Sequence, residues 1–420
     1  MKNFLSRKHF LIVLTLTLGA LQVRGLTRLT PSAKFSVITC SPGPDLYSLF
    51  GHSAFRLQDT LGGKPVDIVF NYGVFDAFDD GFYMKFARGK LDYRLQAEYF
   101  DYFLESYAQE GRGVWEQELN FSPLQKQRLF ELLQANVQEG NCVYRYDFFY
   151  DNCSSRIRDM IIRAAAAEPT DAMGFRYVSL DTLLSVNEVS FKHPCKRGTT
   201  YREAIQKYLD FQPWSDFGID IALGQPCDRT IGDYGFMFLP DSLMLEMQFA
   251  ELGGQMLCRE PAELLPNRTR FTIDYLTAPF SVLFCWFLVH ALISYRHRFS
   301  AKKMMVHEAM LLALSGLISL LVIFLWFFTD HTTTQYNWNV LWASPLHFVI
   351  LVFYRRIGFV RKIAVVQLAL CLVMLVAFPW LPQSLHVASI PISLMLIITY
   401  FRLYQNARNI EHYKSTKEKE

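Results

Sequence analysis

Five apolar stretches follow one another over residues 276–404, separated by short polar segments. Each stretch is long enough to cross a bilayer as a helix, so this part predicts an all-α transmembrane domain of five helices. A further apolar stretch follows the basic residues Lys2, Arg7 and Lys8 at the amino terminus. That arrangement is typical of a signal peptide over residues 1–25, although a retained anchor fits it as well.

The segments between the apolar stretches alternate in charge. Two of them, "YRHRFSAKKM" and "YRRIGFVRK", are basic, as is the carboxy-terminal tail, whereas "DHTTTQYNWN" and "PWLPQS" contain no Lys or Arg. The positive-inside rule places the basic segments in the cytoplasm. We therefore expect residues 26–275 on the outer side of the membrane and residues 405–420 in the cytoplasm.

The exported part has the pattern of a mixed α+β domain. Four runs rich in β-branched and aromatic residues predict strands, namely "KFSVIT", "SAFRLQ", "DIVFNYGVF" and "VWEQELNF". The segment "SPLQKQRLFELLQANVQEG" predicts a helix, because Ser122 and Gln125 can form a capping box and Pro123 occupies the first helical position.

Composition agrees with this division. The chain is 51% hydrophobic and 19% charged, which is more apolar than one ordinary soluble domain requires. The net charge of +3 is too small to indicate a nucleic-acid partner. Neither a zinc-ligand spacing nor a glycine-rich phosphate loop after a strand is found, so the sequence predicts no metal and no other cofactor.

Cys153 is the candidate nucleophile. It precedes an amphipathic pattern in which Ile157, Met160, Ile161 and Ala164 share one face, so it is expected at a helix amino terminus. Unpaired backbone N–H groups there favour a thiolate and can stabilise an oxyanion.

His52, at the start of a predicted strand, is the candidate base. Asn71 on the next strand could orient the imidazole, as in the Cys-His-Asn arrangement of papain-like enzymes. Asp67 and Asp76 are alternatives for this third position. Two structural explanations also remain open at this point, because Cys153 could pair with Cys142 in a disulfide and His52 could be a buried core residue. Cys40 is a rival nucleophile.

Several long blocks of this sequence resemble the Lnb-type lipoprotein N-acyltransferases over nearly the whole chain after the signal peptide. The blocks are "TCSPGPDLYSLFGHSAFRL", "FNYGVFDAFDDGFYMKFARGKLDYRL", "RYDFFYDNCSSRIRD", "TYREAIQKYLDFQPWSDFGIDIALG", "MFLPDSLM" and "NWNVLWASPLH". The exported part also resembles circularly permuted NlpC-type thiol hydrolases and lecithin:retinol acyltransferase, in which the histidine precedes the cysteine. The resemblance implies a protein of the bacterial inner membrane, with residues 26–275 in the periplasm and folded as a circularly permuted papain-like domain.

It also implies acyl transfer. A membrane phospholipid would donate a fatty acyl chain to Cys153 as a thioester, and a diacylated lipoprotein would accept it on its free α-amino group. Three residues of the exported part are candidate substrate contacts, Arg156 and Arg158 for a phosphate and Tyr72 for a head group or oxyanion. Three more come from the outer loop and the helix that follows it, Asn337, Trp342 and His347.

Two other functions use the same features. A membrane-bound thiol hydrolase acting on cell-wall peptides or lipid amides would need the same Cys153 and His52. A non-catalytic envelope protein that binds lipoproteins would need neither side chain to react.

Overall fold

The computed structural model describes residues 28–61, 63–74, 82–165, 189–192, 198–270, 272, 274–298 and 304–417. The predicted signal peptide and Asp76 lie outside these residues. The chain divides into a first unit, Met1–Phe86, Lys90–Thr199 and Ile231–Phe271, and a second unit, Ala87–Gly89, Thr200–Thr230 and Thr272–Glu420.

The first unit contains a seven-stranded sheet in the order β10-β5-β1-β2-β3-β4-β6, in which every neighbouring pair is antiparallel. Its strands are β1 (Lys34–Cys40), β2 (His52–Leu61), β3 (Lys64–Val74), β4 (Asp92–Tyr99), β5 (Val114–Glu118), β6 (Val143–Arg145) and β10 (Ala262–Leu265). The four predicted strands are confirmed as β1, β2, β3 and β5. A small second sheet joins β7 (Val189–Ser190), β8 (Glu251–Leu252) and β9 (Gln255–Met256).

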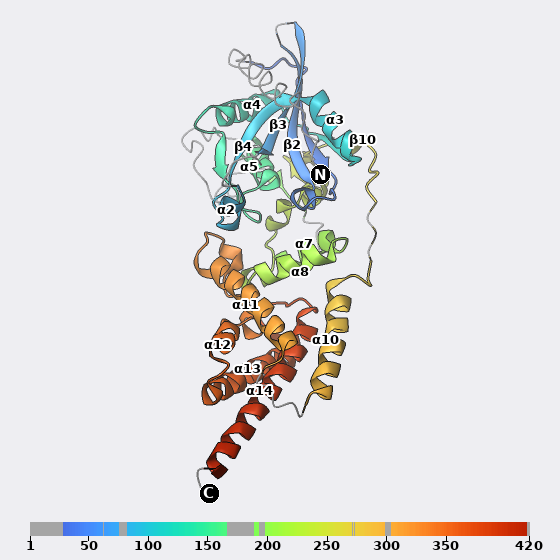
Figure 1. Cartoon of the computed structure of the whole chain (residues 1–420). Coiled ribbons are helices and arrows are strands. Elements are labelled where there is room, and N and C mark those ends of the chain that lie inside the picture. Colours follow the sequence, from blue (N-terminus) through green and yellow to red (C-terminus); the bar gives the residue numbers. More distant parts are fainter. Residues whose placement is uncertain are drawn as a thin grey trace, which may run out of the picture. The chain divides into compact units, whose positions relative to one another are not determined.

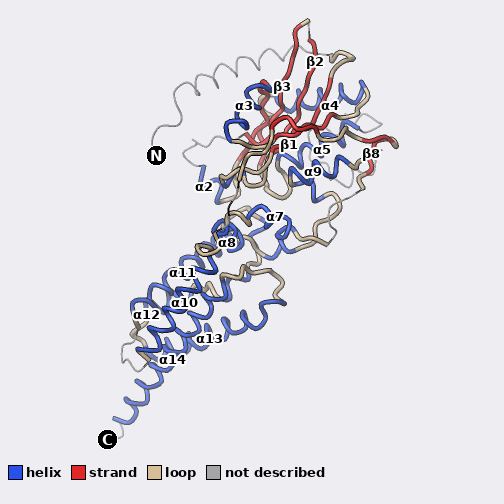
Figure 2. Tube along the Cα trace, turned by 90° about the vertical axis from the view of Figure 1, so that its right-hand side faces the viewer, coloured by secondary structure: helices blue, strands red, loops and turns tan. Residues whose placement is uncertain are grey.

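Helices cover both faces of the large sheet, and this follows from the alternation of side chains along its strands. On one face Ile38, Ala54 and Val69 pack with α3 (Phe100–Glu110). On the other face strand residues pack with α4 (Pro123–Val137) and α5 (Cys153–Ala165). Figure 2 shows the strands between α3 and these two helices. This part of the chain also contains the short helices α2 (Phe82–Ala87), α9 (Pro240–Gln248), η2 (Leu46–Ser48) and η5 (Gly235–Phe238).

The two helices predicted in the exported part begin where the sequence indicates. Pro123 is the first residue of α4, Ser122 accepts from the Gln125 backbone N–H, and the Gln125 side chain accepts from the Ser122 N–H at 2.9 Å. Cys153 is the first residue of α5, whose predicted apolar face is buried. The sheet with its helices confirms the α+β prediction, while the circularly permuted papain-like arrangement stays a prediction.

The second unit is helical (Figure 1). It contains α7 (Tyr201–Leu209), α8 (Pro213–Ala222), η4 (Gln225–Asp228), α10 (Pro279–Arg296), α11 (Val306–Phe327), η7 (Trp338–Leu341), α12 (Leu346–Phe353), α13 (Ile357–Ala377) and α14 (Ser389–Lys417). Among the described residues, three helical segments are long and apolar enough to cross a membrane, Pro279–Arg296, Val306–Phe327 and Ile357–Trp380.

The other two predicted transmembrane stretches do not each form one separate, long apolar helix. The third stretch forms the short helices η7 and α12, with Pro345 just before the start of α12. Pro345 has no backbone N–H to donate, which favours a break between the two helices. The fifth stretch begins α14 at Ser389, and that helix runs on into a polar tail. The count of five crossings therefore stays a prediction.

A buried polar network ties residues 200–230 to the carboxy-terminal part of the second unit. The Arg202 guanidinium is 1% exposed and donates to Asp220 and Asp228. Asn337 donates to the Ile221 carbonyl at 2.7 Å, and Gln383 donates to the Leu223 carbonyl at 2.8 Å. The predicted single exported domain of residues 26–275 stays a prediction, but residues 200–230 have their contacts in the second unit.

Candidate active site

The start of α5 is held rigidly around Cys153. The Asn152 side chain accepts from the Ser155 backbone N–H at 3.0 Å, and Ser155 Oγ accepts from the Asn152 N–H at 2.9 Å. The Asn152 amide also donates to the carbonyls of Phe148 at 2.7 Å and Phe238 at 2.8 Å. This cap leaves the N–H groups of the first two helical residues without a partner inside the helix, beside a half-buried thiol.

Three neighbouring strands each supply one side chain of a hydrogen-bonded row. His52 is the first residue of β2, and its Nε2 lies 2.7 Å from Oδ1 of Asn71 in β3. The Asn71 Nδ2 donates to Oε1 of Glu98 in β4 at 2.9 Å. Asn71 is paired with Gln96, so Glu98 occupies the diagonal position on the same face. Sequence reasoning did not single out Glu98.

Gly73 lies close to both His52 and Cys153. Its φ of +95° is a conformation that favours glycine, and the β3–β4 register shifts between Asn71 and Val74. A Cβ atom at Gly73 would lie 3.6 Å from His52 Cε1 and 4.0 Å from Cys153 Cβ. The missing side chain therefore leaves open space in contact with both catalytic candidates.

The pKa values of Cys153 and His52 move in opposite directions. Burial tends to raise the pKa of the Cys153 thiol, but the His52 charge and hydrogen bonds from His52, the Ser53 backbone and Ser154 outweigh burial, and the net shift is downward. Burial tends to lower the pKa of His52, but the Cys153 charge and hydrogen bonds with Cys153 and Asn71 outweigh it, and the net shift is upward. Both directions favour a thiolate beside an imidazolium.

Two buried serines lie next to the candidate base and nucleophile. Ser53 in β2 and Ser154 in α5 are fully buried, and their hydroxyl oxygens lie 3.1 Å apart. The Ser154 hydroxyl is also 3.9 Å from Cys153 Sγ. Their neighbours in the sequence are the base and the nucleophile, so this contact fixes β2 against the start of α5.

The rival assignments find other partners. Asp67 accepts from Arg56 at 2.8 Å and 2.6 Å, so it does not orient His52. Cys40 is buried, and burial raises the pKa of its thiol to about 12, which makes it a poor nucleophile. Cys142 and Cys153 are both free thiols, as are all cysteines in the described part of the chain, so the disulfide alternative is wrong.

The predicted substrate contacts of the first unit are engaged within the protein. Arg156 donates to both oxygens of Asp151, at 2.6 Å and 2.8 Å. Arg158 donates to Asp159 and to the Tyr234 carbonyl. The Tyr72 hydroxyl is buried and donates to Asn136 at 2.8 Å, so it contributes to the core. A role for these three residues in substrate binding stays a prediction.

The three predicted contacts of the outer loop and α12 are buried in the second unit. Trp342 donates its indole N–H to Asn339 at 2.8 Å, and the same Asn339 contacts Asn337. His347 lies 2.8 Å from the Trp342 carbonyl and is also hydrogen-bonded to the Tyr400 hydroxyl. These bonds give the three side chains a structural function, and a role in substrate binding stays a prediction.

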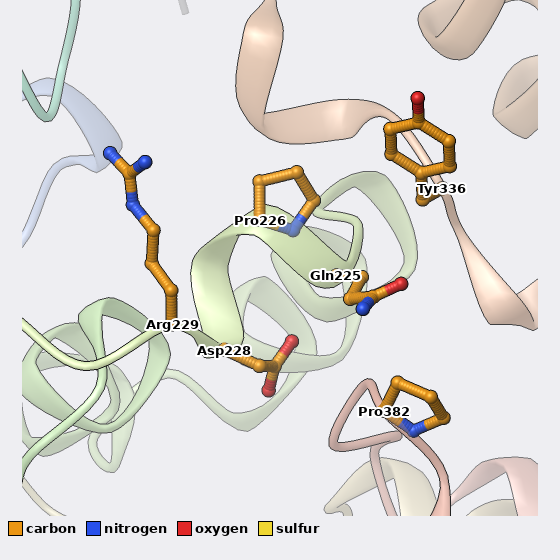
Figure 3. Close-up of a pocket in the computed structure, with 6 residues that line it drawn as sticks. All are labelled: Gln225, Pro226, Asp228, Arg229, Tyr336 and Pro382. Atoms are coloured by element: carbon orange, nitrogen blue, oxygen red, sulfur yellow. The ribbon is translucent and has the colours of Figure 1, made fainter.

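A pocket of about 420 Å³ lies in the second unit (Figure 3). It is lined by Gln225, Pro226, Asp228, Arg229, Tyr336 and Pro382. Figure 3 shows Arg229 and Tyr336 at opposite ends of this pocket. None of the predicted site residues lines it. Within the described ranges no group of three or more His, Cys, Asp or Glu side chains could hold a metal ion.

Comparison with known families agrees with the predicted order of an exported part followed by a membrane part. A model of the Lnb N-terminal periplasmic domain matches residues 27–185, and a model of the Lnb transmembrane domain matches residues 271–409. No curated protein and no solved structure matches the chain. The two matches follow each other in the same chain, cover more than half of it, and include all three residues of the row that begins at His52 as well as Cys153. The chain therefore belongs to the Lnb family of membrane proteins with a periplasmic domain.

Proposed function

We propose that this protein is an apolipoprotein N-acyltransferase of the bacterial inner membrane. It moves a fatty acyl chain from a membrane phospholipid, through a thioester on Cys153, to the α-amino group of a diacylglyceryl-cysteine lipoprotein. The observation that carries this proposal is the half-buried Cys153 thiol at the start of α5, together with the hydrogen-bonded row of His52, Asn71 and Glu98, in a family whose other part is a transmembrane domain.

In the first half-reaction the Cys153 thiolate attacks the ester carbonyl of the phospholipid. The new C–S bond forms as the C–O ester bond breaks, and the His52 imidazolium gives its proton to the departing lysophospholipid alkoxide. The N–H groups at the start of α5 stabilise the negative oxygen of the tetrahedral intermediate. Neutral His52 and an acylated Cys153 remain.

In the second half-reaction the neutral amine of the lipoprotein attacks the thioester. The C–N bond forms, the C–S bond breaks, and His52 accepts the proton that the amine loses. The thiolate and imidazolium are thereby restored. An amide is the more stable product, so transfer to the amine runs downhill.

The membrane part suits both substrates. Donor and acceptor carry acyl chains, and a membrane-anchored enzyme needs to withdraw each chain only partly from the lipid. Basic loops on one side of the helices favour a cytoplasmic carboxy terminus, with Cys153 in the periplasm.

The test is the mass of the peptide that contains Cys153. The full-length protein, purified in detergent, is incubated with dipalmitoyl phosphatidylethanolamine and then with a synthetic diacylglyceryl-cysteine peptide. We expect a hydroxylamine-sensitive palmitoyl group on Cys153 in the first step, and its appearance as an amide on the peptide in the second.

Cys153→Ser should abolish both products. Cys142→Ser is the matched control, since Cys142 is also a partly exposed free thiol of the first unit, and it should retain both. An unmodified Cys153 under these conditions, or a peptidyl rather than a fatty adduct, would contradict the proposal and favour the hydrolase alternative.

A further inference from the structure

Glu98 ends the row of hydrogen bonds that begins at His52. The row runs from His52 to Asn71 and then to Glu98, on the adjacent strands β2, β3 and β4. The charge of His52 in turn lowers the pKa of the Cys153 thiol. Glu98 is half-buried. Burial raises the pKa of its carboxyl, while the hydrogen bond from Asn71 and the His52 charge act in the opposite direction.

We propose that Glu98 is a positioning residue that fixes the orientation of the Asn71 amide and thereby the proton position on His52. The proposal deepens the proposed function, because it rests on Cys153 and His52 acting as the catalytic pair. It concerns a residue that neither touches the substrate nor exchanges a proton with it.

Glu98 fixes the polarity of the Asn71 amide. An ionised carboxylate can only accept hydrogen bonds, whereas an amide has a donating and an accepting end. Glu98 therefore requires the NH₂ end of Asn71 to face it, at the observed 2.9 Å. The carbonyl end, Oδ1, must then face His52.

The orientation of the Asn71 amide determines the tautomer of His52. Oδ1 of Asn71 can only accept, so the His52 Nε2 that lies 2.7 Å away must carry a hydrogen. In the neutral ring the other nitrogen, Nδ1, is then free of hydrogen and takes the proton of the Cys153 thiol. If the Asn71 amide were reversed, Nε2 would face an NH₂ group and the proton would move to Nδ1, the atom that must accept it.

Glu98 differs from two other carboxylates of the same sheet in its partners. Asp67 and Glu116 both accept from Arg56, in β2, and so act as partners of a buried cation. In the described part of the chain Glu98 has its hydrogen bond with the Asn71 amide and no ion pair. Its negative charge is thus available to act through Asn71 on the imidazolium.

The test compares Glu98→Gln with the matched control Glu116→Gln in the full-length protein. Glutamine keeps the size of the side chain but offers either a donor or an acceptor, so the Asn71 amide loses its single orientation. The first measurement is the rate of Cys153 alkylation by iodoacetamide against pH, and the second is the rate of thioester formation from dipalmitoyl phosphatidylethanolamine.

For Glu98→Gln we expect the alkylation midpoint to move upward toward the ordinary thiol value of 9.0. Thioester formation should fall roughly tenfold to a hundredfold, the size of effect seen when the residue that orients a metal-bound histidine is lost. Glu98→Asp, which keeps a carboxylate, should recover part of both, and Glu116→Gln should leave the midpoint unchanged.

The proposal is wrong if folded Glu98→Gln and Glu98→Ala keep the wild-type midpoint and rate. A midpoint that moves equally in Glu116→Gln would also overturn it, because the effect would then come from loss of any carboxylate in the sheet. Alkylation needs no lipid, so failure of the proposed acyl transfer is distinguishable: the midpoint would still respond to Glu98 while no fatty thioester formed.

Discussion

At the scale of single residues, the reactivity of Cys153 depends on the charge of its neighbour His52. The pKa of the thiol is lowered and that of the imidazole is raised, chiefly because the two charges offset the burial of each group. Both shifts favour the pair of a thiolate and an imidazolium. Thioester formation should therefore rise with pH through the lowered pKa of Cys153 and fall through the raised pKa of His52.

The change His52→Ala removes the positive charge that lowers the thiol pKa. The midpoint of Cys153 alkylation against pH should be below 9.0 in the wild type and should move upward in the variant. At neutral pH the variant should react more slowly, since less thiolate is present. Labelling of Cys142 in the same samples is the internal control. Identical Cys153 profiles in both proteins would remove His52 as the base.

Gly73→Ala tests the open space between base and nucleophile. Alanine at φ +95° costs roughly 1–2 kcal/mol of folding stability, and its methyl group would contact His52 and Cys153. We expect slower thioester formation as well as a lower Tm.

Gly140→Ala is the matched control for that change. Its φ is +97°, and nothing lies within 4 Å of the added methyl group. It should lose a similar amount of stability and keep the wild-type rate. Equal rates in the two variants would show that the space at Gly73 has no catalytic importance.

At the scale of elements, local signals in the sequence predicted the elements that carry them. The capping box at Ser122 and the apolar face after Cys153 predicted α4 and α5, and alternation predicted β1, β2, β3 and β5. Two of the missed strands lack such signals, since β6 has three residues and β10 pairs with β5 across more than 140 positions. The strand β4 does alternate, with Tyr93, Leu95 and Ala97 between polar residues, but it was not among the predicted strands. Contacts that depend on register are not readable from one sequence, and so Asn71 remained one of three alternatives and Glu98 was missed.

The cap of α5 is an element-scale feature with its own test. Asn152→Ala removes the bond to the Ser155 N–H and leaves two carbonyls without their donor, so the free energy of unfolding should fall by at least about 1 kcal/mol. Because the helix start also positions Cys153, thioester formation should slow. Chemical denaturation and the acylation assay measure the two effects.

Ser122→Ala is the comparison variant, since it removes the equivalent cap of α4. It should lose about 1 kcal/mol without slowing the reaction. If both variants slowed the reaction equally, the effect would be a general loss of stability rather than a displaced Cys153.

At the scale of the whole molecule, charge asymmetry predicts the orientation in the membrane. A green fluorescent protein fused after Glu420 should fluoresce, and alkaline phosphatase fused there should be inactive, because both report a cytoplasmic carboxy terminus. Fusion after Asp330, which follows α11, should give the reverse result. The same result at both positions would contradict the predicted orientation. The sequence predicted the order of exported and membrane parts, which the two family matches confirm.

The assignment of residues 200–230 to the second unit has a consequence for biosynthesis. The sheet of the first unit is complete only when β10, ending at Leu265, has left the ribosome. The bonds that Asn337 and Gln383 donate to residues 221 and 223 form later still, after about 70 and about 120 further residues are made. During that interval α7 and α8 lack these partners, so we expect both helices to be exposed until the membrane part is made.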